Sequence, residues 1–556
     1  MRTIGFFAGI FCMLLSTTLQ AQPFRCAGTD LPRAAAKIAG KQPQIPAHGH
    51  VNVLVVFAQF ADETPTAVPG FAAELFDPDR PGSFTHFYHT MSFGQLQIHG
   101  TVLPRRYRSD EPAAAYLSQE PGQPGDYGVF VKEILRKVDA DIDLGSFDND
   151  GPDGIANSGD DDGRVDYVFV NLRSVPENFI LGRATGKASL GFRTYRSATD
   201  TSASGKPLRI EGMGYYGTLL QEGSFSQTVG SMAHEFGHGL GLPDLYDTSF
   251  LLTPDQDPAE DGAGVGAWSL MGWGAHGWKG DDGPNPLCAW SREQLGWIGA
   301  DNERLVEVRA DGAELTVADV QREGLAYKVL LPEGEYLLLE QRDSHSQYYN
   351  RDQPAAGLLI WHIRPQAGDN SQEQNKLVDL VCADGRDALD VWAHDVAYCA
   401  MHGGNLGDET DPFDGVRFTH LERGGLAFEI DRQGRAMQVA VSPVGPATIG
   451  AGEPTAVLAD LASPAAFQLL PNYPNPFNPE TTLRYQLPEA VQVRLKIYNA
   501  LGQAVRTLVH GPQPAGVQQV VWNGRDEQGQ EMAGGVYHYR LEAGDRVQTR
   551  QMLLVR

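Results

Sequence analysis

The sequence predicts an α/β (α+β) domain followed by a mostly β domain and a C-terminal β-sandwich. Three observations lead to this prediction. Strand-like and helix-like apolar patterns alternate up to about residue 301, short strand-like runs replace them up to about residue 443, and a last set of such runs follows a linker. A chain of 556 residues is too long for one hydrophobic core, so several domains are expected.

The first domain is expected over residues 49–301. "VNVLVVFAQF" (51–60) and "RVDYVFVNL" (164–172) have the composition of strands, and residues 83–100 indicate a helix, a turn with glycine and a strand. "DYGVFVKEILRKVDADI" (126–142) places apolar residues at helical spacing. Strands that alternate with helices predict an α/β domain.

The rest of the chain is expected to be built mainly of strands. Residues 302–443 hold short runs such as "EYLLLEQR" and "GLLIWHIR" between turns, which predict a β-rich accessory domain. Residues 444–466 are rich in Pro, Gly and Ala and are expected to be a linker. Residues 467–556 contain runs such as "VQVRLKIYN" and "GVYHYRLEAG" at short intervals, which predict a small β-sandwich.

The N-terminus is typical of an exported protein. Arg2 precedes an apolar run that is too short to span a membrane, and small or polar residues follow it up to Ala21. We therefore expect residues 1–21 to be a signal peptide and residues 22–48 a short leader or pro-segment. No later stretch is long and apolar enough to predict a transmembrane helix. The formal net charge of −26 makes nucleic acid an unexpected partner, since phosphate binding needs a basic face.

Cysteine usage predicts disulfides. Cys12 leaves with the expected signal peptide, and four cysteines remain: Cys26, Cys288, Cys382 and Cys399. An even count in an exported protein suggests two bridges, for which three connectivities exist. The local pair Cys382–Cys399 would leave Cys26 to pair with Cys288.

The stretch "HEFGHGLGLPDLYD" (234–247) carries the pattern of a zinc site. His234 and His238 are four positions apart, which places both imidazoles on one face of a helix. Glu235 would lie beside a zinc-bound water and accept its proton, as in the HExxH motif. The alternative is a solvated helix with incidental histidines, but Gly237 and Gly239 would each cost such a helix about 1 kcal/mol relative to alanine.

The residues after the two histidines make the pattern more specific. Gly241 can turn the chain sharply at the end of the helix, and Asp244 then lies where a third ligand could reach the metal. A more distant Asp or Glu is the alternative third ligand. Met271, in the turn "AWSLMGWG" (267–274), resembles the Met-turn below the zinc of metzincins, which usually have histidine where this chain has Asp244.

The same stretch resembles the signature of the immune inhibitor A class of secreted bacterial metallopeptidases. Other segments of residues 50–430 are also similar to that family, among them "FYHTMSFGQLQIHGTV" (87–102), "DDDGRVDYVFV" (160–170), "PNPLCAWSREQLGWI" (284–298) and "GLLIWHI" (357–363). The resemblance implies a metzincin-like fold, zinc-dependent hydrolysis of peptide bonds outside the cell, and calcium as a structural ion.

An acidic loop offers candidate calcium ligands. "FDNDGPDGIANSGDDDGRVD" (147–166) places carboxylates among glycine turns, and calcium binds six to eight oxygens. The alternative is a solvated acidic loop, but such a density of charge is repulsive without a cation. The expected ligands are Asp148, Asp150, Asp153, Asp160, Asp162 and Asp166.

The C-terminal segment resembles the sorting, or FlgD-like immunoglobulin-type, module of secreted bacterial proteins. "NYPNPFNPETT" (472–482) is similar to the start of that module and "GVYHYRL" (535–541) to its penultimate strand. The resemblance implies export by a type IX-like secretion machinery, with release or attachment at the cell surface. A generic β-sandwich for binding is the alternative.

Together these patterns predict a secreted zinc endopeptidase that acts on extracellular proteins or peptides. His234, His238 and Asp244 would hold zinc, and Glu235 would activate the attacking water. Two alternatives come from other classes of protein. One is a calcium-dependent surface adhesin that retains a metallopeptidase fold without turnover, which the presence of Glu235 disfavours. The other is a calcium-dependent binding module, which leaves the histidines unexplained.

Overall fold

The computed structural model describes most of the chain in two compact units, Met1–Pro446 and Ala447–Arg556. The described residues are 26, 45–120, 123–151, 153–214, 216–248, 262–308, 312–344, 348–386, 388–390, 404–444, 467–469, 472, 477, 479, 481–514, 516–544 and 546–555. The expected signal peptide, most of the expected leader and linker, and Cys399 lie outside them. None of the described helices is long and apolar enough to cross a membrane.

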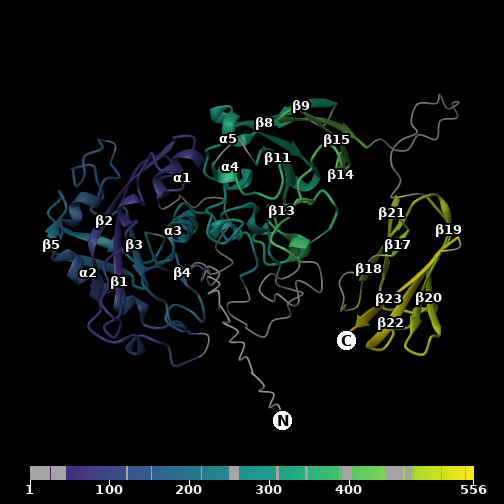
Figure 1. Cartoon of the computed structure of the whole chain (residues 1–556), viewed down its shortest axis with the longest axis horizontal. Coiled ribbons are helices and arrows are strands. Elements are labelled where there is room, and N and C mark those ends of the chain that lie inside the picture. The colour runs from purple at the N-terminus through teal and green to yellow at the C-terminus, as the bar shows by residue number, and fades with distance from the viewer. Residues whose placement is uncertain are drawn as a thin grey trace, which may run out of the picture. The chain divides into compact units, whose positions relative to one another are not determined.

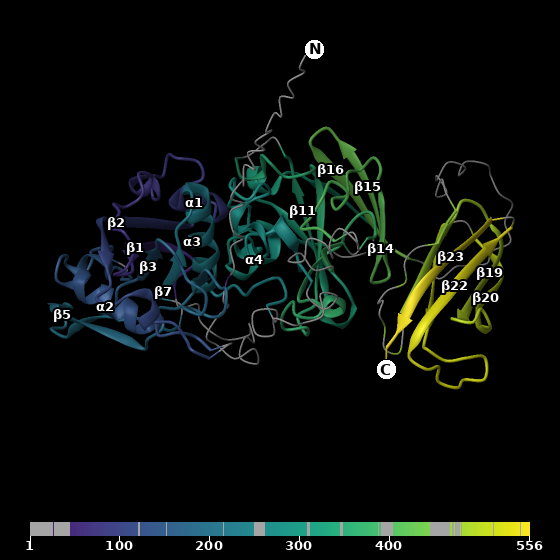
Figure 2. The ribbon, with the colours of Figure 1, turned by 60° about the horizontal axis from the view of Figure 1, so that its bottom comes forward.

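The first unit begins with a five-stranded sheet of order β2-β1-β3-β7-β4 (Figures 1 and 2). Four of its strands are parallel and β4 is an antiparallel edge strand paired with β7. The strands are β1 (Gly49–Gln59), β2 (Leu96–Arg108), β3 (Tyr167–Leu172), β4 (Gly186–Lys187) and β7 (Gly217–Gln221). A separate two-stranded sheet joins β5 (Thr194–Thr201) to β6 (Pro207–Glu211).

Helices cover both faces of this sheet. Successive side chains of a strand point to opposite faces, and the apolar run of β1 therefore supplies two cores. Val53 and Val55 pack with helices α1 (Phe84–Met91) and α3 (Phe225–Gly239), whereas Leu54 packs with α2 (Tyr127–Asp139). Figures 1 and 2 show α1 and α3 together on one face of the sheet and α2 on the other.

Two further sheets complete this unit. A five-stranded sheet has the order β13-β12-β11-β10-β8, and a four-stranded sheet has the order β14-β15-β16-β9. Their strands are β8 (Leu305–Val308), β9 (Ala313–Val317), β10 (Ala326–Leu330), β11 (Tyr336–Arg342), β12 (Gly357–Ile363), β13 (Val378–Leu380), β14 (His420–Arg423), β15 (Leu426–Gln433) and β16 (Ala436–Pro443). The short helices α4 (Ala289–Gln294) and α5 (Val320–Glu323) lie in the same half of the sequence.

The expected boundary at residue 302 does not separate two hydrophobic cores. Strand β12 is buried on both faces: Leu358 and Ile360 pack between the two later sheets, whereas Leu359 and Trp361 pack into the core that contains α3. The regions expected as catalytic and accessory domains therefore share one core and form one compact unit.

The second unit is a β-sandwich of two sheets. Its three-stranded sheet has the order β17-β18-β21 and its four-stranded sheet the order β20-β19-β22-β23, with one apolar core between them. The strands are β17 (Gln468–Leu469), β18 (Thr481–Leu487), β19 (Val491–Asn499), β20 (Ala504–Gln513), β21 (Gly516–Trp522), β22 (Gly535–Ala543) and β23 (Arg546–Leu554). Phe477, from the motif that precedes β18, is buried in this core.

The predicted disulfides are wrong for the described cysteines. Cys26, Cys288 and Cys382 all carry thiols. Cys288 lies before α4, with its sulfur 3.4 Å from Ser291 Oγ, whereas Cys26 lies beside α3 with its sulfur 3.4 Å from His238 Nε2. The even count of cysteines was a misleading signal, because the tertiary fold gives each of these two thiols a polar neighbour of its own.

Candidate metal centre

Helix α3 carries His234, Glu235 and His238 into the interior of the first unit. Ser224 begins the helix: its side chain accepts a hydrogen bond from the Gln227 amide, and the Gln227 side chain accepts one from the Ser224 amide. This reciprocal capping satisfies two amide donors of the first turn. His234, Glu235 and His238 are each no more than 1% exposed, so their polarity needs compensation from buried partners.

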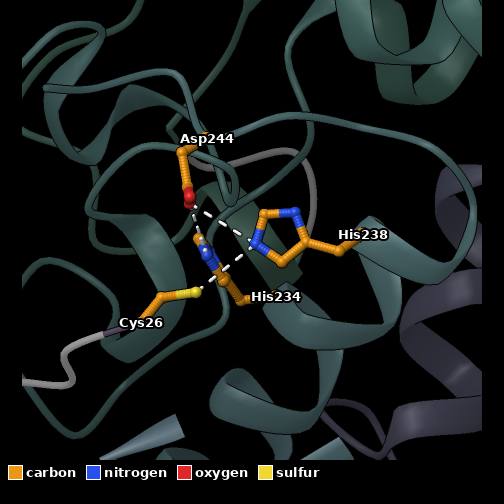
Figure 3. A group of neighbouring side chains, drawn as sticks. All are labelled: Cys26, His234, His238 and Asp244. Atoms are coloured by element: carbon orange, nitrogen blue, oxygen red, sulfur yellow. Dashed lines mark hydrogen bonds and ion pairs between the residues drawn. The ribbon is translucent and has the colours of Figure 1, made fainter. Parts of the chain in front are cut away.

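The chain turns back after α3 and brings Asp244 to the two histidines. Gly241 has a φ of +97°, a conformation that glycine adopts without strain. Asp244 Oδ1 then lies 3.0 Å from His234 Nε2 and 3.5 Å from His238 Nε2. The three residues that the sequence predicts as zinc ligands are thus brought together (Figure 3).

Backbone carbonyls fix the orientation of both imidazoles. His234 Nδ1 lies 2.9 Å from the Leu270 carbonyl oxygen, and His238 Nδ1 lies 2.8 Å from the Leu242 carbonyl oxygen. A carbonyl only accepts hydrogen bonds, so each Nδ1 must be the donor. With Nδ1 as the donor to a carbonyl, the neutral form of each imidazole carries its lone pair on Nε2, the atom that faces Asp244 and that a metal would bind.

Met271 lies directly below the helix. A Cβ on Gly237 would lie 2.6 Å from the Met271 sulfur, so the absence of a side chain at this glycine lets the methionine approach the helix. The Met271 carbonyl accepts a hydrogen bond of 2.8 Å from the Leu245 amide. Residues 270 and 271 therefore hold both His234 and the neighbour of Asp244.

The fourth polar group of the cluster is Cys26, for which the sequence predicted only a disulfide. Its side chain is 1% exposed and its sulfur lies 3.4 Å from His238 Nε2. The sulfur, the two Nε2 atoms and an Asp244 oxygen all lie within 4.8 Å of one another. Figure 3 shows the four side chains converging from the N-terminal segment, helix α3 and the turn after it.

Electrostatics favour a cation between these groups. Burial lowers the pKa of His238, but the charge of Asp244 and the hydrogen bond to it, together with the charge of Glu235, raise that pKa to about 9. Burial also opposes ionisation of Asp244, yet the charge of His238 and hydrogen bonds from both histidines hold its pKa well below the usual range. The two histidine nitrogens and the Asp244 oxygen converge on one point and are all atoms that bind metals, so the donor set fits a divalent metal.

Glu235 faces the same cluster in an unusual state. Both of its carboxylate oxygens are buried and have no hydrogen-bond partner among the described residues. Burial raises the pKa of Glu235, and the charges of His238 and His234 and the nearby Cys26 thiol partly offset that rise. A buried carboxylate without a partner is costly, and a base positioned for a water beside a metal explains that cost.

Tyr246 is a second residue that the sequence patterns did not single out. Its ring centroid lies 6.4 Å from that of His234. Burial raises its pKa well above the usual value, and the charges of Asp244, Cys26 and Glu235 raise it further. The phenol thus remains neutral as a hydrogen-bond donor beside the cluster. The sequence signal that could have identified Tyr246 is its position two residues after the predicted ligand Asp244.

The acidic loop brings together three of its six predicted ligands, Asp148, Asp150 and Asp162, with one oxygen of each within 4.8 Å of the others. Asp148 is fully buried, and neither of its oxygens has a hydrogen-bond partner among the described residues. Burial and then the charge of Asp161 raise the pKa of Asp148 to about 7. Asp162 is also paired with Arg164.

The other three predicted calcium ligands hold the loop itself. Asp153 accepts a hydrogen bond of 2.8 Å from the Ile155 amide, and Asp160 accepts one of 3.1 Å from the Asp153 amide. Asp166 accepts hydrogen bonds from the amides of Asn52 and Asn149 at 2.8 and 3.1 Å. These carboxylates compensate backbone donors and are not part of the cluster of three.

Two family models match parts of the chain. Residues 71–300 match the model of the immune inhibitor A peptidase M6 catalytic domain, and residues 477–546 match that of the FlgD Ig-like domain. These matches support a metallopeptidase domain followed by an Ig-like domain.

Curated relatives match only part of the chain. Immune inhibitor A of Bacillus thuringiensis subsp. alesti is 31% identical over 227 residues, which cover 37% of this chain and 30% of the relative. Pre-pro-metalloprotease PrtV of Vibrio cholerae is 28% identical over 280 residues, or 45% of this chain and 28% of the relative. The chain thus spans less than a third of the length of either protein. A crystal structure of OgpA from Akkermansia muciniphila aligns over 93% of this chain and 96% of that one, at 13% identity and a TM-score of 0.24, which is too low to indicate a shared overall fold.

Proposed function

We propose that this protein is an exported zinc-dependent endopeptidase that hydrolyses extracellular proteins. The observation that carries the proposal is the convergence of His234 Nε2, His238 Nε2 and Asp244 Oδ1 beside the buried, unpartnered carboxylate of Glu235. Zinc held by these three ligands would supply a Lewis acid that lowers the pKa of a coordinated water toward neutrality.

The chain's own residues account for the remaining steps. Glu235 accepts the proton of the attacking water and delivers it to the leaving amine of the scissile bond. The burial of Glu235 raises its pKa, which makes the carboxylate a better base near neutral pH. Tyr246, kept neutral by its surroundings, can donate a hydrogen bond to the oxygen that becomes negative in the transition state.

The edge strand β4 offers a place for the substrate backbone. An edge strand presents unpaired amides and carbonyls, to which an extended peptide can add as a further strand. Gly186 of β4 already forms a β-bridge with Cys26, so an extended chain bound at this edge also reaches the metal cluster.

The test compares the full-length chain with two variants, Glu235→Gln and Asp244→Asn. Each is assayed for bound zinc and for hydrolysis of casein. The assays are made before and after brief trypsin treatment, because cleavage after Cys26 would remove the thiol that lies at the site. Glu235→Gln is expected to keep zinc and lose about a hundredfold to ten-thousandfold in rate. Asp244→Asn is expected to lose zinc and activity together.

Other results would favour other functions. If Asp244→Asn keeps its zinc, a more distant carboxylate is the third ligand. If the wild type binds zinc but never hydrolyses casein or a library of denatured proteins, a surface adhesin that retains a metallopeptidase fold replaces the peptidase.

We further propose a structural calcium ion at Asp148, Asp150 and Asp162, because the fully buried Asp148 carboxylate lacks a partner among the described residues.

The export part of the proposal is supported by the N-terminal apolar run and by the resemblance of residues 472–482 to a type IX sorting module. Deletion of residues 447–556 is expected to keep the protein inside an expression host that has a type IX machinery.

A further inference from the structure

The N-terminal segment reaches the metal cluster from a great distance in the sequence. Cys26 and His238 are 212 positions apart, yet the thiol is buried and lies 3.4 Å from the imidazole Nε2. The backbone of Cys26 forms a parallel β-bridge with Gly186 of β4. Cys26 is therefore held by two contacts, its backbone at the edge of the sheet and its thiol at the cluster.

The chemistry of the thiol fits the metal as well as the two histidines do. A cysteine thiolate is among the strongest protein ligands for zinc, and catalytic zinc sites have three protein ligands and one open position, whereas structural sites are closed by four. His234, His238 and Asp244 provide three ligand atoms, and the Cys26 sulfur lies within 4.8 Å of each of them. It is thus positioned as the fourth.

The position of the thiol also bears on Glu235. Glu235 follows His234 directly on α3 and is buried in the same interior as the Cys26 thiol, which lies 3.4 Å from His238 Nε2. The water that Glu235 would deprotonate needs the open fourth position of the metal, and the Cys26 sulfur is placed for that same position. The β-bridge to Gly186 also covers part of the edge strand to which a substrate could add.

We propose that Cys26 is the fourth ligand of the metal and keeps this site closed until the N-terminal segment is removed or displaced. This inference rests on the proposed function. Hydrolysis of a peptide bond between Cys26 and β1 by a peptidase, with one water consumed, separates the thiol from the catalytic unit. Three protein ligands then remain, together with an open position for water and a free edge of β4.

The test replaces zinc by cobalt(II) in the full-length chain and compares the wild type with Cys26→Ser. A thiolate ligand gives cobalt a sulfur-to-metal charge-transfer band in the near ultraviolet. We expect this band in the wild type and in the matched control Cys382→Ser, and its loss in Cys26→Ser while cobalt remains bound. Cobalt bound to the wild type without this band overturns the proposal.

A second measurement follows the thiol directly. The wild type is treated with iodoacetamide with metal bound and after removal of the metal by a chelator, and the alkylation of Cys26 is quantified by mass spectrometry. We expect protection of Cys26 only with metal bound, whereas equal alkylation in both states contradicts ligation.

Activity distinguishes this inference from the proposed function. Cys26→Ala is expected to hydrolyse casein about tenfold faster or more than the untreated wild type, because a site that is open in a tenth of the molecules works in that fraction only. If the band is present and Cys26→Ala is inactive, the ligand assignment stands and the peptidase proposal fails. If Cys26→Ala and the wild type are equally active and the band is absent, the peptidase proposal stands and the assignment of Cys26 as a ligand fails.

Discussion

Gly230 of helix α3 approaches Ala275 so closely that a Cβ on the glycine would lie 1.8 Å from the Ala275 carbonyl oxygen. Ala275 belongs to the 3-10 turn Gly274–His276, shortly after Met271. The contact packs the segment 270–276 against helix α3. The Leu270 carbonyl of this segment is the group that accepts the hydrogen bond from His234. The packing of backbone on backbone at Gly230 thus supports the metal cluster.

Gly230→Ala is expected to destabilise the first unit strongly. The new methyl group meets a backbone oxygen that cannot move alone, so overpacking should cost about 3 kcal/mol or more. Gly237→Ala is the matched control, because its Cβ would meet the flexible thioether of Met271, and alanine regains about 1 kcal/mol of helix propensity. Thermal unfolding and zinc affinity measure both effects; equal destabilisation by the two variants would show that the backbone contact at Gly230 has no special role.

Stability should depend on pH through His276. Burial lowers the pKa of His276 to about 4, against the opposing charge of Asp281, and its Nε2 lies 3.1 Å from Ser231 Oγ. Between pH 6.5 and 4 the unfolded chain therefore binds a proton that the folded chain does not. The contribution of neutral His276 is complete above pH 6.5 and decreases as the pH falls toward 4.

The variant His276→Gln isolates this effect, since glutamine is neutral and can still bond to Ser231. The free energy of unfolding is measured for both proteins by urea denaturation from about pH 7 to about pH 4. We expect the wild type to lose more stability than the variant over this interval. Parallel curves would show that His276 does not titrate differently in the folded state.

Calcium should stabilise the first unit through the acidic loop. A ligand that binds only the folded state at a hundred times its dissociation constant adds about 2.7 kcal/mol, so the melting temperature should rise when calcium is added. Asp148→Asn should abolish this rise, because Asp148 is the buried member of the cluster and has no hydrogen-bond partner among the described residues. Asp153→Asn should keep it, since Asp153 bonds to the Ile155 amide instead.

Phe477 should matter to the folding of the second unit. Its side chain is 2% exposed and packs on Trp522, and its amide donates a hydrogen bond to the Leu553 carbonyl. Phe477→Ala is expected to cost the β-sandwich about 3–5 kcal/mol, whereas Pro479→Ala, at an exposed position of the same motif, should be nearly neutral. Calorimetry should show this loss of stability in only one of two unfolding transitions. A loss in both transitions would show that the two units do not unfold independently.

The parts of the site that could be predicted from the sequence are local. The spacing of His234 and His238 depends only on the helical repeat. Asp244 follows shortly after the helix, where the positive φ of Gly241 turns the chain back toward the histidines. Cys26 could not be found in this way. Its place depends on the pairing of a segment near the N-terminus with Gly186, and neither spacing nor composition encodes that pairing.

The domain boundary expected at residue 302 and the choice among the expected calcium ligands both depend on tertiary contacts that composition does not encode. "GLLIWHI" is apolar at nearly every position, which is typical of a strand buried on both faces, and this signal indicated a core shared across residue 302. Among the acidic residues, the conformation of the loop decides which carboxylates converge and which bond to amides. Composition shows only that enough of them are present.

The role of the metal cluster in catalysis is best decided by comparing Cys26→Ala with the double variant Cys26→Ala/Glu235→Gln, both loaded with zinc and assayed on casein. We expect equal zinc in the two proteins, rapid hydrolysis by the first, and a rate lower by about a hundredfold to ten-thousandfold in the second. Equal rates at equal zinc content would contradict the role of Glu235 as the base and, with it, the assignment of this cluster as a peptidase site.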